Sequence, residues 1–123
     1  MNGVALVMLG GALGAPCRFW VDTAVVRALD RPLWVGTLVV NVIGCLVLGL
    51  VTGWTLTHPD PSWPAAFIGT GFCGALTTFS TFSVQAWNLV ASGRQRTAVM
   101  AVAANTAIGG AVAVLGMVVT GGW

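Results

Sequence analysis

Four long apolar stretches, separated by short polar segments, dominate the chain. They cover approximately residues 3–29, 33–57, 63–91 and 97–120 of 123. Each is long enough for a helix that crosses the hydrocarbon core of a bilayer, which takes about 20 residues. In lipid the backbone has to satisfy its own hydrogen bonds, and a helix does so within one segment. The sequence therefore predicts an all-α membrane protein, a single domain of four transmembrane helices over residues 1–123.

The composition argues against a soluble protein, because the chain has too few charged residues to form a water-facing surface. Only 7% of the residues are charged and the mean hydropathy is +0.92, whereas a soluble domain carries about 25% charged residues. Tryptophans stand near the ends of the stretches, where the ring can lie at headgroup level; they are Trp34, Trp54, Trp63 and Trp123. No Lys or Arg precedes the first stretch, so we expect it to be a span and not a cleaved signal peptide. We predict a multi-pass protein of the cell (inner or plasma) membrane.

The ionisable groups are too few for most enzyme chemistry. The chain has one His, three Asp and no Glu, which argues against an enzyme because acid–base or metal chemistry needs clustered groups. The cysteines, Cys17, Cys45 and Cys73, are isolated and are expected to be apolar fillers. Asp22 follows Arg18 by one helical turn, so a local ion pair is predicted. A proton-coupled cation exporter of the small four-helix type needs an embedded carboxylate, and only Asp22 is available for that role.

The polar side chains that remain inside the spans are neutral. Asn41 lies in the middle of the second stretch, where an amide is costly unless it is paired or wetted. Hydrogen-bonding side chains in the third and fourth stretches are Thr77, Thr78, Ser80, Thr81, Asn105 and Thr106. Donors without carboxylates suit an anion. The alternative for each Ser or Thr is a bond to its own helix backbone four residues back.

The third stretch contains the sequence GALTTFSTF at residues 74–82. Glycines followed by β-branched and hydroxyl residues are poor helix formers, so the stretch is predicted to break into two half-helices near Gly74–Thr77. A break inside the membrane is tolerated where it lines a cavity or is buried in protein. Phe79 and Phe82 share one face of the second half-helix, and their electropositive ring edges suit an anion path. Ordinary core packing is the alternative for this pair.

Three motifs give the chain a family resemblance. GxxGAxxR at residues 11–18, GTLxVNxxGC at residues 36–45 and GFCGALTTFSTF at residues 71–82 resemble the CrcB/Fluc fluoride-channel family, in the same order and in the expected helices. The resemblance extends over essentially the whole chain. It implies a passive, fluoride-selective channel that exports fluoride across the bacterial inner membrane and confers resistance to it. It also implies an antiparallel, dual-topology dimer with two pores in the family's homodimers.

The resemblance also implies roles for individual residues. Phe79 and Phe82 match the ring edges that face fluoride, Asn41 matches the pore asparagine, and Ser80 and Thr81 match the polar track beside them. The backbone carbonyls of Gly74 and Thr77 match the ligands of a structural Na⁺ at the dimer interface. Arg18 matches an arginine that is expected to give a pore vestibule positive potential. The family commonly has a tyrosine on the fourth helix, and this chain has none, so Asn105 and Thr106 are the nearest polar candidates.

The arginines are unevenly shared between the two sides of the membrane. Four of them flank the first and third loops, namely Arg27, Arg31, Arg94 and Arg96, and none flanks the opposite side. Such a bias opposes insertion in both orientations, so we expect loops one and three in the cytoplasm and both termini outside. An antiparallel dimer then requires a homologous partner of opposite bias, whereas a homodimer stays open as the alternative. A cation or multidrug exporter and a non-transporting scaffold subunit also stay open.

Overall fold

The structure is a computed structural model that describes residues 2–60 and 62–121. Trp123, predicted to lie at a membrane surface, is outside the described residues. Four helices are long and apolar enough to cross a membrane, at Gly3–Ala28, Leu33–Thr57, Ser62–Ala91 and Gln95–Gly121. The prediction of an all-α protein with four spans is therefore confirmed. The elements are α1 (Gly3–Thr23), η1 (Ala24–Ala28), α2 (Leu33–Thr57), α3 (Ser62–Pro64), η2 (Ala65–Cys73), α4 (Gly74–Leu76), α5 (Phe79–Ala91) and α6 (Gln95–Gly121), where η1 and η2 are π-helical.

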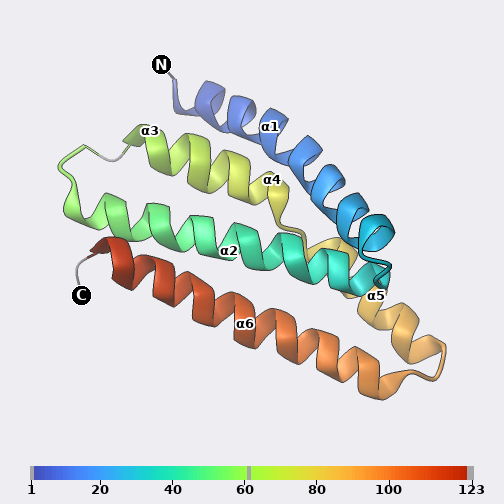
Figure 1. The fold of residues 1–123 in the computed structure, drawn as a ribbon. Coiled ribbons are helices and arrows are strands. Elements are labelled where there is room, and N and C mark those ends of the chain that lie inside the picture. The colour runs from blue at the N-terminus through green and yellow to red at the C-terminus, as the bar shows by residue number, and fades with distance from the viewer. Residues whose placement is uncertain (1, 61, 122–123) are drawn as a thin grey trace.

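The four spans lie side by side (Figure 1). α2 packs along α6, and α1 packs along η2 and α4, which places α2 and the first half of the third span at the centre. The two termini and the loop between α2 and α3 lie at one end of the molecule. The loops between η1 and α2 and between α5 and α6 lie at the other end. All four arginines that flank loops one and three are therefore at this second end of the molecule.

Glycine pairs allow close packing inside the subunit. A Cβ atom on Gly10 would collide with the backbone carbonyl oxygen of Phe67, and one on Gly14 would collide with the carbonyl oxygen of Phe72. A Cβ on Gly49 would collide with the backbone of Ala113 in α6. Gly10 and Gly14 are four residues apart, a spacing that allows helix backbones to approach closely. These glycines therefore make contacts between helices of the same chain.

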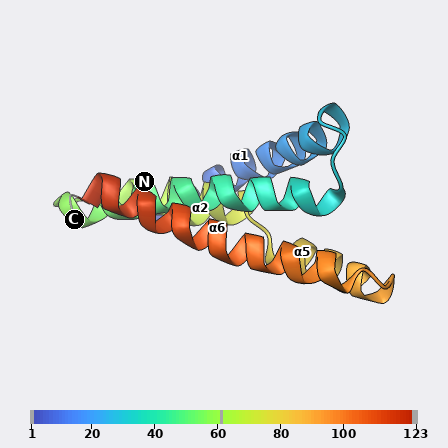
Figure 2. The ribbon, with the colours of Figure 1, turned by 60° about the horizontal axis from the view of Figure 1, so that its bottom comes forward.

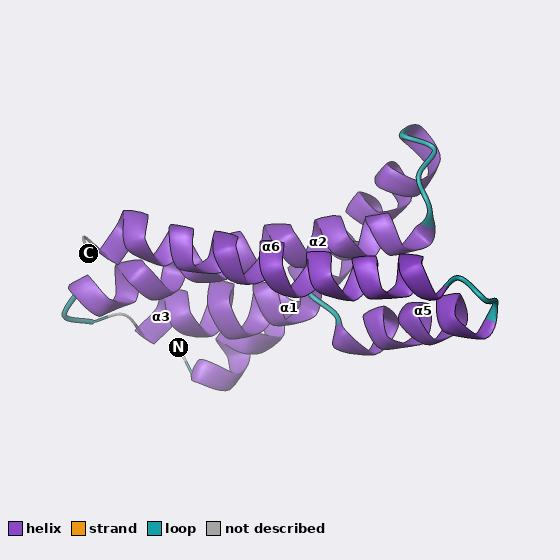
Figure 3. Cartoon of the chain, turned by 90° about the horizontal axis from the view of Figure 1, so that it is seen from below, coloured by secondary structure: helices purple, strands orange, loops and turns teal. Residues whose placement is uncertain are grey.

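The third span is broken at Thr77 and Thr78 (Figure 3). Both residues have extended backbone, with φ −79° and ψ 155° at Thr77 and φ −149° and ψ 124° at Thr78. The predicted break is confirmed, at the C-terminal end of the predicted segment, because Gly74 is still helical in α4. Thr78 caps the next helix, since its hydroxyl oxygen accepts a hydrogen bond from the Thr81 N–H at 3.3 Å. After the break, α5 runs beside α6 and away from α1 (Figure 2).

Candidate functional site

The Asn41 side chain holds the break in the third span. Its Oδ1 accepts a hydrogen bond from the Thr78 N–H at 2.9 Å, and its Nδ2 donates to the Thr78 carbonyl at 3.3 Å. The same Nδ2 donates to Asn105 Oδ1 at 3.0 Å. Because the Thr78 N–H needs an acceptor, these bonds also fix which end of the amide is oxygen. One amide therefore joins α2, the broken span and α6.

A cavity of about 310 Å³ lies beside this network. Its walls come from α2, the break, α5 and α6, and none of these residues, all within the described ranges, is charged. They are Asn41, Cys45, Leu48, Thr77, Thr78, Phe79, Phe82, Asn105 and Thr106. The structure thus brings together both predicted phenylalanines, the predicted asparagine and the two polar residues of the fourth helix. We call this space the phenylalanine cavity.

Phe79 and Phe82 lie close together in the phenylalanine cavity. Their ring centroids are 5.9 Å apart and the ring planes are tilted by 49°. Phe79 is 80% exposed in the single subunit, so it is not a residue of the subunit's core. That exposure argues against the packing alternative for Phe79, because a core ring is buried by its own chain.

A second cavity, of about 210 Å³, lies on the other side of the break. We call it the arginine cavity. Its lining residues are Ala15, Arg18, Phe19, Asp22, Thr37, Val40, Thr78 and Thr81. Thr81 therefore lines the arginine cavity and not the phenylalanine cavity. Ser80 lines neither of them, and its hydroxyl lies 3.5 Å from that of Thr78. Thr78 lines both cavities and separates them.

Asp22 does not form the predicted ion pair through its buried oxygen. Its Oδ1 is buried and has no hydrogen-bond partner among the described residues, so Arg18 does not donate to this atom. The carboxylate instead lies against Gly36 of α2, where a Cβ atom would collide with Oδ1. Both charged groups line the arginine cavity, so the carboxylate partly offsets the positive potential that Arg18 gives it.

The carbonyl groups of Gly74 and Thr77 have lost the partners that a continuous helix would give them. The Thr78 N–H, four residues after Gly74, donates to Asn41. The Thr81 N–H, four residues after Thr77, donates to the Thr78 hydroxyl. Gly74 and Thr77 also line a third cavity, of about 500 Å³. Backbone oxygens released in this way suit a hard cation such as Na⁺, so the residues present fit the ion that the resemblance implies.

Sequence reasoning did not single out Thr78 or Thr37. Thr78 was one hydroxyl among several, yet its N–H, carbonyl and hydroxyl all take part in holding the break. Thr37 is 1% exposed and lines the arginine cavity. The signal for Thr37 was its place one helical turn before Asn41, which puts both on the same face of α2. No sequence signal distinguished Thr78 from Thr77.

Comparisons with known proteins agree with these motifs. Residues 5–117 match the model of the family described as "CrcB-like protein, Camphor Resistance (CrcB)". The chain is 44% identical to "Fluoride-specific ion channel FluC 2" of Rhodococcus jostii, over 95% of this chain and 97% of that protein. It is 42% identical to "Fluoride-specific ion channel FluC" of Thermococcus onnurineus, over 88% and 89% of the two chains.

A further relative matches over a shorter region. "Fluoride-specific ion channel FluC 1" of Nocardia farcinica is 50% identical over 73% of this chain, which corresponds to 61% of the length of that relative. The family match extends through the first, second and third motifs and most of α6. This chain belongs to the CrcB family.

Proposed function

We propose that this chain is a subunit of a fluoride-selective channel that exports fluoride passively across the cell membrane and so protects against fluoride toxicity. The observation that carries the proposal is the phenylalanine cavity, whose lining combines two phenylalanines, two asparagines and threonine hydroxyl groups without a charged residue. The names of the relatives from Rhodococcus and Thermococcus support the choice of ion.

Fluoride is small and strongly hydrated, so a conducting site has to replace its water with donors that do not hold it too firmly. Phe79 and Phe82 would offer weakly positive ring edges. Asn41 has a different part, because both hydrogens of its amide are already donated to Thr78 and Asn105. We assign it the task of holding the break open beside the ion path. Asn105, which donates to Ala101 at 3.1 Å, keeps one N–H for an anion.

The path then continues past the break. Ser80 and Thr81 would pass the ion from the phenylalanine cavity toward the arginine cavity, with Thr78 between the two. Arg18 would raise the local anion concentration there, because a positive group in a low-dielectric cleft attracts anions. In this assignment no step requires a titrating group, which is consistent with passive flow down a gradient.

A second subunit would complete the site. Packed against the face that carries Phe79, it would bury a ring that is 80% exposed in the single chain. The carbonyls of Gly74 and Thr77, together with those of the second subunit, would hold a structural Na⁺ at the two-fold axis. That charge would offset the repulsion between anions in two neighbouring pores. The proposed assembly is an antiparallel dimer.

The test is a fluoride-electrode assay on liposomes that contain the purified chain, with its partner subunit if one is needed. We expect valinomycin-dependent fluoride efflux with no chloride efflux. A parallel assay measures proton-driven uptake of an aromatic cation, as a small exporter would perform. Cation uptake without fluoride efflux would show that the chain is an exporter and not a channel. If a confirmed dimer transports neither ion, the chain is a scaffold subunit that does not transport.

A further inference from the structure

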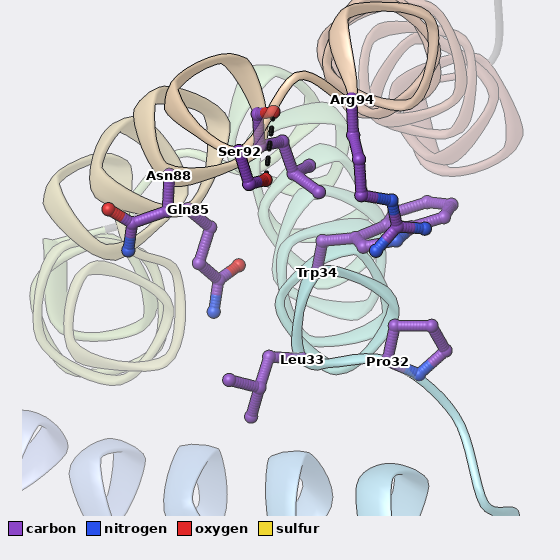
Figure 4. Close-up of a pocket in the computed structure, with 8 residues that line it drawn as sticks. Pro32, Leu33, Trp34, Gln85, Asn88, Ser92 and Arg94 are labelled. Carbon is purple, nitrogen blue, oxygen red and sulfur yellow. Dashed lines mark hydrogen bonds between the residues drawn. The ribbon is translucent and has the colours of Figure 1, made fainter.

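A cavity of about 230 Å³ lies at the arginine-rich end of the molecule, away from both the phenylalanine and the arginine cavities. Figure 4 shows it between the start of α2, the end of α5 and the start of α6. Its lining residues are Pro32, Leu33, Trp34, Gln85, Asn88, Leu89, Ser92 and Arg94. We call it the interfacial cavity, because all three spans that form it end there.

The interfacial cavity is lined by hydrogen-bond donors and no carboxylate. Arg94 and Trp34 both line it, from the start of α6 and the start of α2 (Figure 4). The indole Nε1 of Trp34 is buried and has no partner among the described residues. A buried N–H without an acceptor costs about 1–3 kcal/mol, so an acceptor that reaches this atom would be favoured. Because the atom has almost no exposed surface, the side chains that cover it have to move aside when a ligand binds. Gln85 and Asn88 also line the cavity.

Helix ends add to the positive character of the cavity. α2 begins at Leu33, its first turn has no side-chain cap, and the first turn lines the cavity. α6 begins at Gln95, directly after Arg94. The first N–H groups of a helix are unpaired and carry a partial positive charge, so they attract anions. Phosphate oxygens accept such bonds and pair well with arginine.

The position of the cavity indicates where the phosphate would come from. The walls also include Leu33, which is 61% exposed, and Leu89. Both stand at the ends of spans, so they face the region where acyl chains meet headgroups. An apolar wall beside a cluster of donors fits a lipid, because the tail can follow the leucines while the phosphate meets the donors. Free phosphate would gain nothing from that wall.

We propose that the interfacial cavity binds the phosphate group of an anionic phospholipid such as phosphatidylglycerol. The Arg94 guanidinium and the Trp34 Nε1–H donate to the phosphate oxygens, and the start of α2 supplies further positive potential. The lipid is held on the side where the arginines of loops one and three gather. Its binding links the ends of α2, α5 and α6, which meet at this cavity.

The test is native mass spectrometry of the full-length protein in detergent, with dioleoyl phosphatidylglycerol or dioleoyl phosphatidylcholine added. We expect phosphatidylglycerol to bind more tightly. Arg94→Gln should weaken its binding about tenfold, the size of one charge-assisted hydrogen bond. Trp34→Phe keeps the apolar ring but removes the N–H, and should weaken binding about threefold. Arg94→Lys should restore most of the affinity.

Two matched controls use residues outside the cavity. Arg96→Gln removes an arginine of the same loop, and Trp87→Phe changes a tryptophan of α5 that is 68% exposed. Both should bind phosphatidylglycerol as the unchanged protein does. Equal binding by Arg94→Gln, or equal losses at Arg96, would overturn the proposal. So would displacement of the lipid by millimolar inorganic phosphate, which would make free phosphate the ligand. Because the readout is lipid binding, it is independent of fluoride flux.

Discussion

The Asn41 side chain makes hydrogen bonds with its oxygen and with both amide hydrogens, to the Thr78 backbone and to Asn105. It therefore replaces part of the hydrogen bonding that a continuous helix would supply, because it pairs the N–H and the carbonyl of Thr78 at the break. Asn105 is in turn held by the Ala101 carbonyl. The geometry at the phenylalanine cavity depends on this small network more than on any other polar contact.

Asn41→Asp should damage the protein severely. A carboxylate still accepts the Thr78 N–H, but its second oxygen would face the Thr78 carbonyl and Asn105 Oδ1, which are both acceptors. We expect a loss of about 1–3 kcal/mol in stability, as for unsatisfied buried groups, and less fluoride efflux than in any phenylalanine variant. Thermal unfolding in detergent and the liposome assay measure the two effects.

Asn2→Asp is the matched control for that substitution. Asn2 uses only its side-chain oxygen, which accepts the Val4 N–H at 3.0 Å. An aspartate keeps this cap at the start of a helix. If Asn2→Asp lowers the stability as much as Asn41→Asp does, the loss at Asn41 does not come from the hydrogen bonds that its Nδ2 donates.

Phe79→Ile and Phe82→Ile should each reduce fluoride efflux by an order of magnitude or more. Isoleucine fills much of the space but has no electropositive edge. Folding should change little for Phe79, which is exposed in the subunit. Phe67→Ile in η2 is the control, because Phe67 lines neither the phenylalanine nor the arginine cavity. Unchanged flux in both variants would mean that this subunit's own rings do not line a working pore.

At the level of the helices, close packing of α2 against α6 depends on glycine. The carbonyl of Ala113 lies directly over Gly49, and a Cβ atom on Gly116 would be 2.8 Å from the Leu50 backbone nitrogen. The two helices therefore meet backbone to backbone, where even one methyl group forces them apart. Thr120 adds a hydrogen bond between them, since its hydroxyl lies 2.8 Å from the Leu50 carbonyl.

Gly49→Ala should lower the stability by about 1–3 kcal/mol, the usual cost of overpacking. Gly110→Ala is the control, because nothing lies within 4 Å of the added Cβ atom. In a helix alanine is more favourable than glycine by about 1 kcal/mol, so Gly110→Ala should be neutral or stabilising. The melting temperatures of the two variants in the same detergent decide the matter. A drop of equal size in both would contradict the packing argument.

Hydropathy and motif spacing were sufficient to predict the spans and the break, because both depend on local composition. The family resemblance implied that Asn41, Phe79 and Phe82 lie along one path, and all three line the phenylalanine cavity. The position of Arg18 and Thr81 on the other side of the break was not predictable, since it depends on how α1 diverges from α5. The structural role of the two glycines in the second motif, GTLxVNxxGC, is visible only in the folded protein. Gly36 gives room to the Asp22 carboxylate, and Gly44 gives room to the Thr77 methyl group.

The whole molecule has an uneven distribution of positive charge. Four arginines lie at the end formed by loops one and three, whereas the end with the termini has neither Lys nor Arg. With this bias a chain inserts in one orientation. For the proposed antiparallel dimer we therefore predict a homologous partner with the opposite bias. That partner would also supply the polar group that the family resemblance implies as a tyrosine on the fourth helix.

Reporter fusions at the C-terminus test this orientation. An alkaline phosphatase fusion, active only outside, should give strong signal, and a green fluorescent protein fusion, fluorescent only in the cytoplasm, should give little. Arg94→Ala together with Arg96→Ala should make the two signals more equal, because the bias is halved. Strong signal from both fusions of the unchanged chain would favour the homodimer.

The Asn41 network also has a consequence for synthesis of the protein. Asn41 leaves the ribosome 37 residues before Thr78, its backbone partner. An amide that enters hydrocarbon without a partner costs several kcal/mol, so the second span is less stable alone in lipid than beside the third span. We expect the insertion machinery to retain it until the third span arrives and then to release the two together. Force measurements on the nascent chain should show one joint insertion event for these spans, and Asn41→Leu should divide it into two.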